Sequence, residues 1–391
     1  MLNKNEFGTL VRAHRKQRGW TQEELAEKWG HSRAYISQIE GGQRKLESIP
    51  QVMRLADILE IPQEKLEEVG RGFPERKMRG KSSAQTDDAI LQLLLAPSRD
   101  MVKLSYMIWL TDQHPMIERK LQDLIANLDA VLPMYRGTFK KPAQQLLAYA
   151  HQMIGKIAFD RLDYVSATGH FSEMIDLGRE LSDADIIALG MVRQGDVLRK
   201  RGRYETALKC FEAAKPYADA ADLNIQGIRL INIARSYYFL GDEQNFLKAI
   251  NPALEAAAQI GKEGNDSLAY WFNLDVVLQF QASGYTALQK PKKALEIYKE
   301  IERRLPSRPL RDRGAYTIEK ARAYLELGDL ENGMKSSLRG LKLASQYHSK
   351  RHVARLEATY HRLQTTPFGK DKRLCILRDA LREAQRAQID W

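Results

Sequence analysis

The first 70 residues place apolar side chains at helical spacing in three short segments. These apolar positions are Phe7, Leu10 and Val11, then Leu25 and Ala26, then Ile36 and Ile39. Apolar residues three and four positions apart lie on one face of an α-helix. The pattern predicts three short helices that share a small core, the first of them over residues 6–18.

Polar residues and glycines between these segments predict where the helices begin and end. Thr21 and Glu24 have the spacing of a capping box, so a helix should start at Gln22. Ser32 is placed to cap the next helix, and Gly41 with Gly42 should end it. Two short helices joined by a tight turn form the helix-turn-helix arrangement.

The same residues carry a family resemblance. The segments TQEELAEK, SRAYISQIEGGQR and LADILEI stand where the Xre/Cro type of helix-turn-helix domain has its second, third and fifth helices. The resemblance implies a five-helix DNA-binding domain over residues 1–69 and a structural ion pair between Arg15 and Glu40. We also expect Trp20 and Trp29 to belong to the core.

The second helix of such a pair enters the major groove of DNA and contacts base edges. Arg33 is suited to guanine, Gln38 to adenine and Ala34 to a thymine methyl group. Gln22 resembles the family's phosphate-contacting glutamine, and the residues after the recognition helix should follow the DNA backbone. The predicted DNA-binding residues are Gln22, Arg33, Ala34, Tyr35, Ser37, Gln38, Gln43, Arg44 and Lys45.

The net positive charge of the chain is only weak support for a nucleic-acid partner. The chain has 391 residues and a net charge of +11. Residues 1–80 contribute fifteen Lys and Arg against twelve Asp and Glu, so most of the excess lies elsewhere. Residues 70–89 are rich in glycine and basic residues, which predicts a linker. Its positive charge could add phosphate contacts.

From residue 90 to 391 the chain repeats a pair of helices. The clearest copy contains Gly195, Gly202, Tyr204, Ala207 and Phe211. Equivalent positions recur at Ala167, Ala207, Phe246, Ala294 and Gly333, separated by 40, 39, 48 and 39 residues. No segment alternates as a strand would, so the predicted class is all-α, with an α-solenoid after the N-terminal domain.

These repeats resemble the tetratricopeptide repeat, although their period exceeds its 34 residues. In that family the first helix of each pair lines a concave surface. Counting from the packing glycines and alanines gives the predicted peptide-binding residues, which are Gln152, Lys156, Asp196, Arg199, Asn232, Arg235, Tyr238, Gln279 and Arg322. Amide and guanidinium groups can bind a peptide backbone or a carboxylate.

The order of the two parts resembles the Rgg/PlcR-like peptide-pheromone receptors. The resemblance implies a cytoplasmic transcriptional regulator that binds double-stranded DNA as a homodimer, at an inverted repeat. A short signalling peptide of the quorum-sensing type would bind the solenoid and alter the dimer. The alternative is a repressor whose solenoid binds a protein partner and no small ligand.

Other function classes lack support in the sequence. No phosphate-binding loop, nucleophile elbow or pair of catalytic carboxylates is present, so we expect neither an enzyme nor a cofactor. His348 and His352 are four residues apart but lack the glutamate of a zinc motif, so we expect no metal. Cys210 and Cys375 favour a reducing compartment. The polar N-terminus and short apolar runs predict neither a signal peptide nor a membrane span.

Overall fold

The computed structural model describes residues 4–29, 33–43, 52, 55–56, 58–62, 65–66, 82–111, 114–263 and 272–387. Throughout these residues the regular structure is helical, which confirms the predicted all-α class. The chain divides into two compact units, one of residues 1–91 with 126–138 and one of residues 92–125 with 139–391. None of the described helices is long and apolar enough to cross a membrane.

The N-terminal unit contains α1 (Lys4–Gln17), α2 (Gln22–Trp29) and α3 (Arg33–Glu40). The predicted capping box is present: the backbone N–H of Glu24 donates to Thr21 Oγ1 at 3.2 Å, and that of Thr21 donates to Glu24 Oε2 at 2.7 Å. Gly19 follows α1 with φ of 71° and Gly42 follows α3 with φ of 67°, a region that favours glycine. The predicted start of α2 and the glycine ends of α1 and α3 are therefore confirmed, whereas α1 begins at Lys4, two residues before its predicted start. Ser32 lies outside the described residues.

The core of this unit joins the three helices to residues 52–66. The predicted apolar positions are buried, with Leu10 partly so. Trp29 is 3% exposed, whereas Trp20 is only half buried and lies under the cationic groups of Arg18 and Lys28. The buried cluster also contains Val52, Leu55, Ala56, Leu59, Ile61 and Leu66. The fourth and fifth helices of the expected five-helix domain fall mostly outside the described residues.

The second part of the chain opens with two long helices, α6 (Ser82–Trp109) and α7 (His114–Val131). Both cross the division between the two units. Helix α6 begins at Ser82, inside the segment predicted as a linker over residues 70–89. Residues 70–81 lie outside the described residues.

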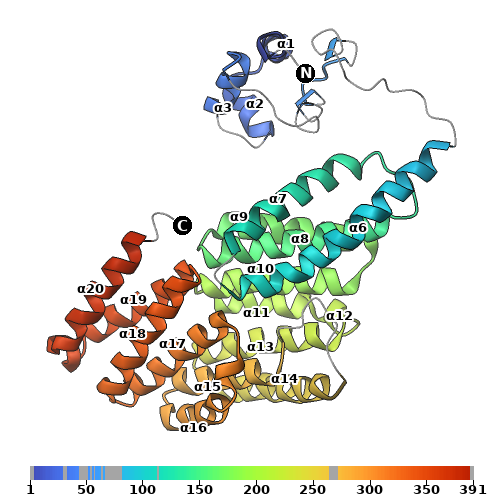
Figure 1. Ribbon diagram of the computed structural model, residues 1–391. Coiled ribbons are helices and arrows are strands. Elements are labelled where there is room, and N and C mark those ends of the chain that lie inside the picture. Colours follow the sequence, from blue (N-terminus) through green and yellow to red (C-terminus); the bar gives the residue numbers. More distant parts are fainter. Residues whose placement is uncertain are drawn as a thin grey trace. The chain divides into compact units, whose positions relative to one another are not determined.

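Six helix pairs follow within the described residues (Figure 1). They are α8 (Lys140–Asp160) with α9 (Tyr164–Leu181), α10 (Ala184–Lys200) with α11 (Tyr204–Ala213), α13 (Leu223–Phe239) with α14 (Glu243–Glu263), α15 (Leu274–Ala287) with α16 (Pro291–Glu302), α17 (Leu310–Glu326) with α18 (Leu330–Gln346), and α19 (Lys350–Gln364) with α20 (Lys372–Ala387). The short helix α12 (Lys215–Ala218) and the 3-10 turns η1 (Leu305–Ser307) and η2 (Pro367–Lys370) lie in connections. Consecutive helices pack against each other along the array.

Short polar side chains set the start of seven of these twelve paired helices. In each case the side-chain oxygen accepts a hydrogen bond from the backbone N–H three residues later. A cap of this kind stabilises a helix by about 1 kcal/mol. The capping residues are Asp163, Asp183, Asp222, Asp242, Asn273, Asp329 and Ser349.

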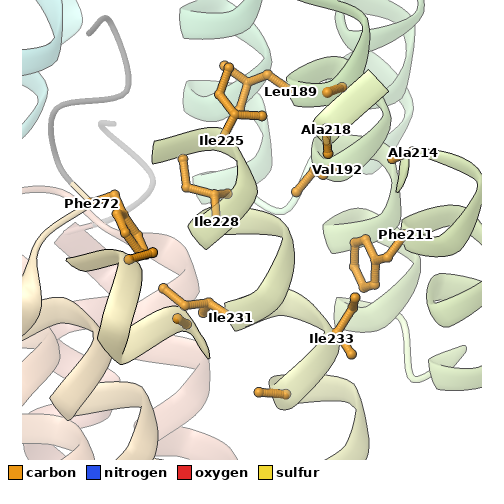
Figure 2. Packing of buried hydrophobic residues seen from close by; sticks show 14 of the residues in the cluster. Leu189, Val192, Phe211, Ala214, Ala218, Ile225, Ile228, Ile231, Ile233 and Phe272 are labelled. Atoms are coloured by element: carbon orange, nitrogen blue, oxygen red, sulfur yellow. The ribbon is translucent and has the colours of Figure 1, made fainter. Parts of the chain in front are cut away.

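Small residues let the paired helices approach closely. Gly155 of α8 faces the ring of Phe171 in α9, and Gly195 of α10 faces Phe211 in α11. A Cβ atom at either glycine would overlap the opposing ring. Figure 2 shows Phe211 in an apolar cluster with isoleucines of α13 and Phe272. The five predicted repeat equivalents, Ala167, Ala207, Phe246, Ala294 and Gly333, are all buried on second helices.

Candidate functional site

Helix α3 separates a buried face from an exposed one. Ile36 and Ile39 are each 1% exposed and hold the helix against the core. Four other residues of α3 face solvent, as a recognition helix requires. The exposed side chains are Arg33, Ala34, Ser37 and Gln38, four of the predicted base-contacting residues.

Tyr35 and Gln43 flank this face differently. The Tyr35 ring is half buried, with its centroid 5.6 Å from that of Trp29. Gln43 is exposed directly after α3. Arg44 and Lys45, the other predicted phosphate contacts, lie outside the described residues.

Arg33 forms a weak, exposed ion pair. Its Nε lies 3.2 Å from Glu23 Oε1 of α2, and both side chains are more than 60% exposed. Ion pairs at this exposure contribute about 0–1 kcal/mol. The guanidinium of Arg33 can therefore leave Glu23 for a guanine edge at little energetic cost.

Glu40 organises the base of the recognition helix. It is 4% exposed and accepts hydrogen bonds from Arg15 Nε at 2.5 Å and from Gln22 Nε2 at 2.9 Å. Burial favours the neutral acid, but the bonds from Arg15 and Gln22 outweigh it and lower the pKa of Glu40. The expected ion pair is present, and Gln22 is oriented at the first turn of α2, where the sequence predicted a phosphate contact.

The helical unit contains a cavity of about 170 Å³. It lies where first helices of the pairs converge with the C-terminal end of α6. Five of the predicted peptide-binding residues line it: Lys156, Asp196, Arg235, Tyr238 and Gln279. These residues come from four different first helices, so the prediction that first helices form the polar inner surface agrees with the structure.

The other four predicted residues are buried or partly buried beside the cavity and contact its lining or neighbouring side chains. Gln152 accepts a hydrogen bond from Tyr106 Oη, and Asn232 Oδ1 accepts one from Arg235 at 3.0 Å. Arg199 forms an ion pair with Asp196, and Arg322 pairs with Glu319 at 3.2 Å.

Sequence reasoning missed fourteen of the nineteen lining residues. The missed residues include Arg193, Arg308, Arg311, Asp312, Glu319, Arg351, His352 and Arg355. Arg351 and Arg355 lie on α19, which follows Gly333, the last repeat equivalent that the sequence indicated. The one available signal was the spacing of Arg351, His352 and Arg355, which places all three on one side of that helix.

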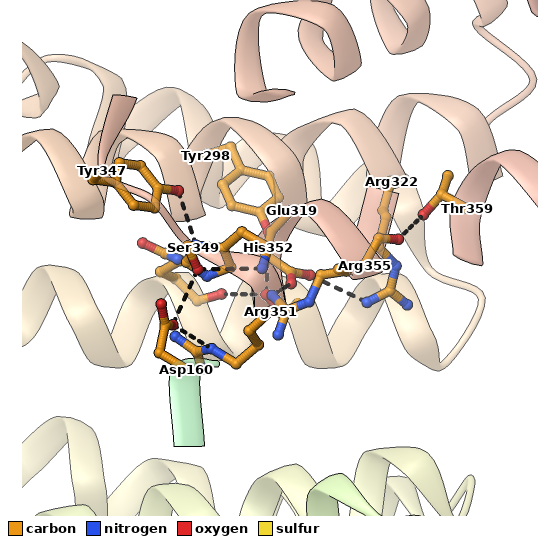
Figure 3. Close-up of polar contacts among 12 residues, drawn as sticks. Asp160, Tyr298, Glu319, Arg322, Tyr347, Ser349, Arg351, His352, Arg355 and Thr359 are labelled. Carbon is orange, nitrogen blue, oxygen red and sulfur yellow. Dashed lines mark hydrogen bonds and ion pairs between the residues drawn. The ribbon is translucent and has the colours of Figure 1, made fainter. Parts of the chain in front are cut away.

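Buried ion pairs hold these side chains in place (Figure 3). Glu319 of α17 pairs with Arg322 of its own helix and with Arg355 of α19. Burial alone would raise the pKa of Glu319, but the two guanidinium groups lower it. Asp196 likewise pairs with Arg199 and with Arg235, at 3.4 Å, and its pKa is lowered despite burial. Both carboxylates are therefore charged at neutral pH.

Lys156 illustrates the crowding of positive charge. Its Nζ lies 4.2 Å from the ring centroid of Trp109 and 4.6 Å from that of Tyr106, so aromatic faces favour the cation. Burial, with repulsion from Arg193 and Arg311, nevertheless lowers its pKa well below the usual 10.5. Burial and the neighbouring Arg199 lower the pKa of Arg235 to about 10.

Asp160 connects the two ends of the array. Its carboxylate lies 2.9 Å from Arg311 of α17 and accepts hydrogen bonds at 3.0 Å from Ser349 and from Arg351 of α19. Arg311 also donates to the carbonyl of Trp109 at 2.8 Å. The first helix pair, the last two pairs and α6 thus meet at the cavity.

Comparison with known proteins identifies one part of the chain. Residues 6–69 match the model of a helix-turn-helix domain. The curated proteins contain no match to the chain. Among solved structures it is similar to Bacillus thuringiensis PlcR, determined in complex with the peptide PapR7 and DNA. That similarity has 14% sequence identity and a TM-score of 0.37, and covers 76% of this chain and 93% of PlcR.

Proposed function

We propose that this protein is a sequence-specific DNA-binding transcriptional regulator whose helical-repeat unit binds a short signalling peptide. One observation supports both halves of the proposal. The same chain carries a helix-turn-helix domain with an exposed recognition face and a polar cavity lined by several first helices. A module that contacts bases, joined to a module that binds a ligand, can couple gene control to a signal.

On DNA, Arg33 and Gln38 would contact base edges from the exposed face of α3. Contacts to phosphates would fix the position of the domain on the DNA. They would come from Gln22, Gln43, Arg44 and Lys45. In a homodimer, two recognition helices about 34 Å apart would match an inverted repeat of half-sites one helical turn apart. The peptide would change the preferred dimer arrangement, and only by binding one arrangement more tightly than the other.

In the helical unit, polar side chains from successive repeats would hydrogen-bond an extended peptide. Lys156, Asp196, Arg235, Tyr238 and Gln279 line the cavity. The other four predicted residues would hold the lining side chains in position rather than contact the peptide. These residues are Gln152, Arg199, Asn232 and Arg322. Backbone hydrogen bonds would give affinity, and the cavity would give selectivity.

The test is selection of DNA from a random duplex pool by the purified full-length protein. It is repeated with a small-molecule extract of spent growth medium from the source organism, intact or treated with a peptidase. We expect an inverted repeat whose enrichment changes with the intact extract and not with the treated one. The Arg33→Ala variant should enrich a site with a relaxed preference at one base.

The other outcomes separate the parts of the proposal. Enrichment that ignores the extract would contradict peptide control and favour a protein partner. Enrichment of single half-sites would contradict the homodimer. Absence of enrichment in both samples would contradict sequence-specific DNA binding.

A further inference from the structure

The cavity of the helical unit has an excess of positive charge. Among the described side chains that line it, seven are lysine or arginine and three are aspartate or glutamate. The basic ones are Lys156, Arg193, Arg235, Arg308, Arg311, Arg351 and Arg355, and the acidic ones are Asp196, Asp312 and Glu319. Isolated buried charges are costly, so an excess of one sign indicates a binding function or a compensating partner.

The acidic residues near the cavity already form ion pairs with arginines. Asp196 and Glu319 each pair with two arginines. Asp160, behind the lining, pairs with Arg311 and Arg351, and Asp312 lies 3.6 Å from Arg308. Each carboxylate that could neutralise the cavity is thus shared or already paired, and the excess remains.

Two guanidinium groups have unused donors at this site. Arg235 Nε and Arg308 NH1 are buried and have no hydrogen-bond partner among the described residues. The side chains of Arg235 and Arg308 are 10% and 8% exposed. The Arg235 guanidinium also lies 4.5 Å from the ring centroid of Phe280, which limits its movement. Arginine donors fixed in this way suit a carboxylate, which can accept two parallel hydrogen bonds.

The size of the cavity limits what can enter it. Pockets that enclose a drug-sized ligand measure about 300–1,000 Å³. At about 170 Å³, this cavity has room for one side chain or one terminus of a peptide. The remainder of the ligand would lie outside it.

We propose that the cavity is a carboxylate-binding subsite, which accepts one acidic side chain or the free C-terminus of the peptide ligand. The inference rests on the proposed function and narrows its ligand to peptides with a carboxylate at one end or at one defined position. Arg235 and Arg308 would donate to that carboxylate. Selectivity would come from charge, since a neutral group would leave the buried cations without an anion.

The ionisation of the lining agrees with an anionic occupant. Burial and neighbouring Arg193, Arg311 and Arg351 lower the pKa of Lys156. Lys200 is not among the lining residues, but burial and the lining arginines Arg355 and Arg351 lower its pKa to about 7. An incoming anion would offset this repulsion and raise both pKa values. Carboxylate binding should then be accompanied by proton uptake near neutral pH.

The experiment uses affinity selection of synthetic heptapeptide libraries on the full-length protein. One library has no Asp or Glu and a free C-terminus, a second has the same composition with a C-terminal amide, and a third is amidated with one Glu at a varied position. The best peptide of each library is titrated calorimetrically. Acetate, succinate and citrate are titrated separately, because a free small acid could supply the same carboxylate.

We expect peptides with a carboxylate to bind at least about tenfold more tightly than amidated peptides without one, as charged hydrogen bonds typically allow. Equal binding by both kinds would overturn the carboxylate subsite and leave peptide binding intact. Binding of small acids without any peptide would support the subsite and overturn the peptide as ligand. If neither binds, the subsite is overturned as well.

Variants connect the effect to the cavity. Arg308→Gln and Arg235→Gln should each weaken the carboxylate peptide about tenfold and reduce its advantage over the amide. Arg235→Gln also removes a partner of Asp196, so its unfolding is measured in parallel and Arg308→Gln serves as the second variant. Lys209→Gln is the matched control, because Lys209 is an exposed cation on α11. The cavity would not be the carboxylate-binding subsite if the Lys209 variant bound carboxylate and amidated peptides equally. The same conclusion would follow if both arginine variants still bound the carboxylate peptide about tenfold more tightly than the amidated one.

Discussion

Asp160 of α8 accepts a hydrogen bond from Arg351 of α19 at 3.0 Å, across 191 residues of sequence. Ser349 and Arg311 bind the same carboxylate. The first and last helix pairs are therefore joined, and the arginines that make the connection also line the cavity. Any anion that enters the cavity lies beside groups that already hold the array together.

The Asp160→Asn variant should destabilise the helical unit strongly. Removing the charge leaves Arg311 and Arg351 buried without their shared anion, and breaking a buried pair in this way costs about 3–5 kcal/mol. Urea unfolding followed by circular dichroism measures the change. Asp176→Asn breaks an exposed pair with Arg179 and should cost less than about 1 kcal/mol. Equal costs would show that the Asp160 contacts contribute little.

The stability of the helical unit should fall as the pH decreases from 6.5 to 4. His151 is buried with its Nδ1 2.9 Å from Nδ1 of His170. Burial, and then repulsion from His170, lower the pKa of His151 from 6.5 to about 4. The unfolded chain therefore binds a proton that the folded chain does not, and stability present above pH 6.5 is lost on acidification.

The His151→Gln variant measures this contribution. Because one pKa unit corresponds to about 1.4 kcal/mol, the wild type should lose up to about 3 kcal/mol more than the variant between pH 6.5 and 4. Urea unfolding at several pH values gives the difference. His361→Gln, at an exposed histidine, is the control and should follow the wild type. Parallel curves for His151→Gln and wild type would refute the prediction.

The Arg33→Ala variant should weaken binding to the selected DNA site by about 1–3 kcal/mol and relax the preference at one base. Arg33 lies on the exposed face of α3, and only a surface pair with Glu23 competes for it. Arg44→Ala, at a predicted phosphate contact, should weaken all sequences alike. Binding to a panel of single-base variants of the site distinguishes the two. Uniform weakening by both substitutions would show that Arg33 does not contact a base.

Two helical glycines should respond to alanine in opposite directions. A Cβ atom at Gly195 would overlap the ring of Phe211, so Gly195→Ala should cost about 1–3 kcal/mol. Gly169 of α9 is exposed and a Cβ atom there meets no neighbour within 4 Å. Gly169→Ala should stabilise by up to about 1 kcal/mol, since alanine favours the helix. Thermal unfolding compares them, and a loss of stability at Gly169 would contradict this account of the packing.

Much of the N-terminal unit could be predicted because its signals are local. A capping box at Thr21 and Glu24, glycines at 19 and 42 and two isoleucines on α3 each act within a few residues. Once Ile36 and Ile39 face the core, the geometry of a helix turns Arg33 and Gln38 to solvent. The pair of Arg15 with Glu40 came from the family resemblance instead.

The sequence by itself determined the all-α class, the helix pairs and the first helices as the source of a polar inner surface. Periodicity and small residues carry that information, since both concern one helix and its immediate neighbour. Only the tertiary structure decided that Arg311, Arg351 and Arg355 join Lys156, Asp196 and Arg235 around one cavity. Helical periodicity shows which face of α19 is polar, but the partner of that face depends on how every intervening pair packs. The charge of the cavity is therefore a property of the folded array.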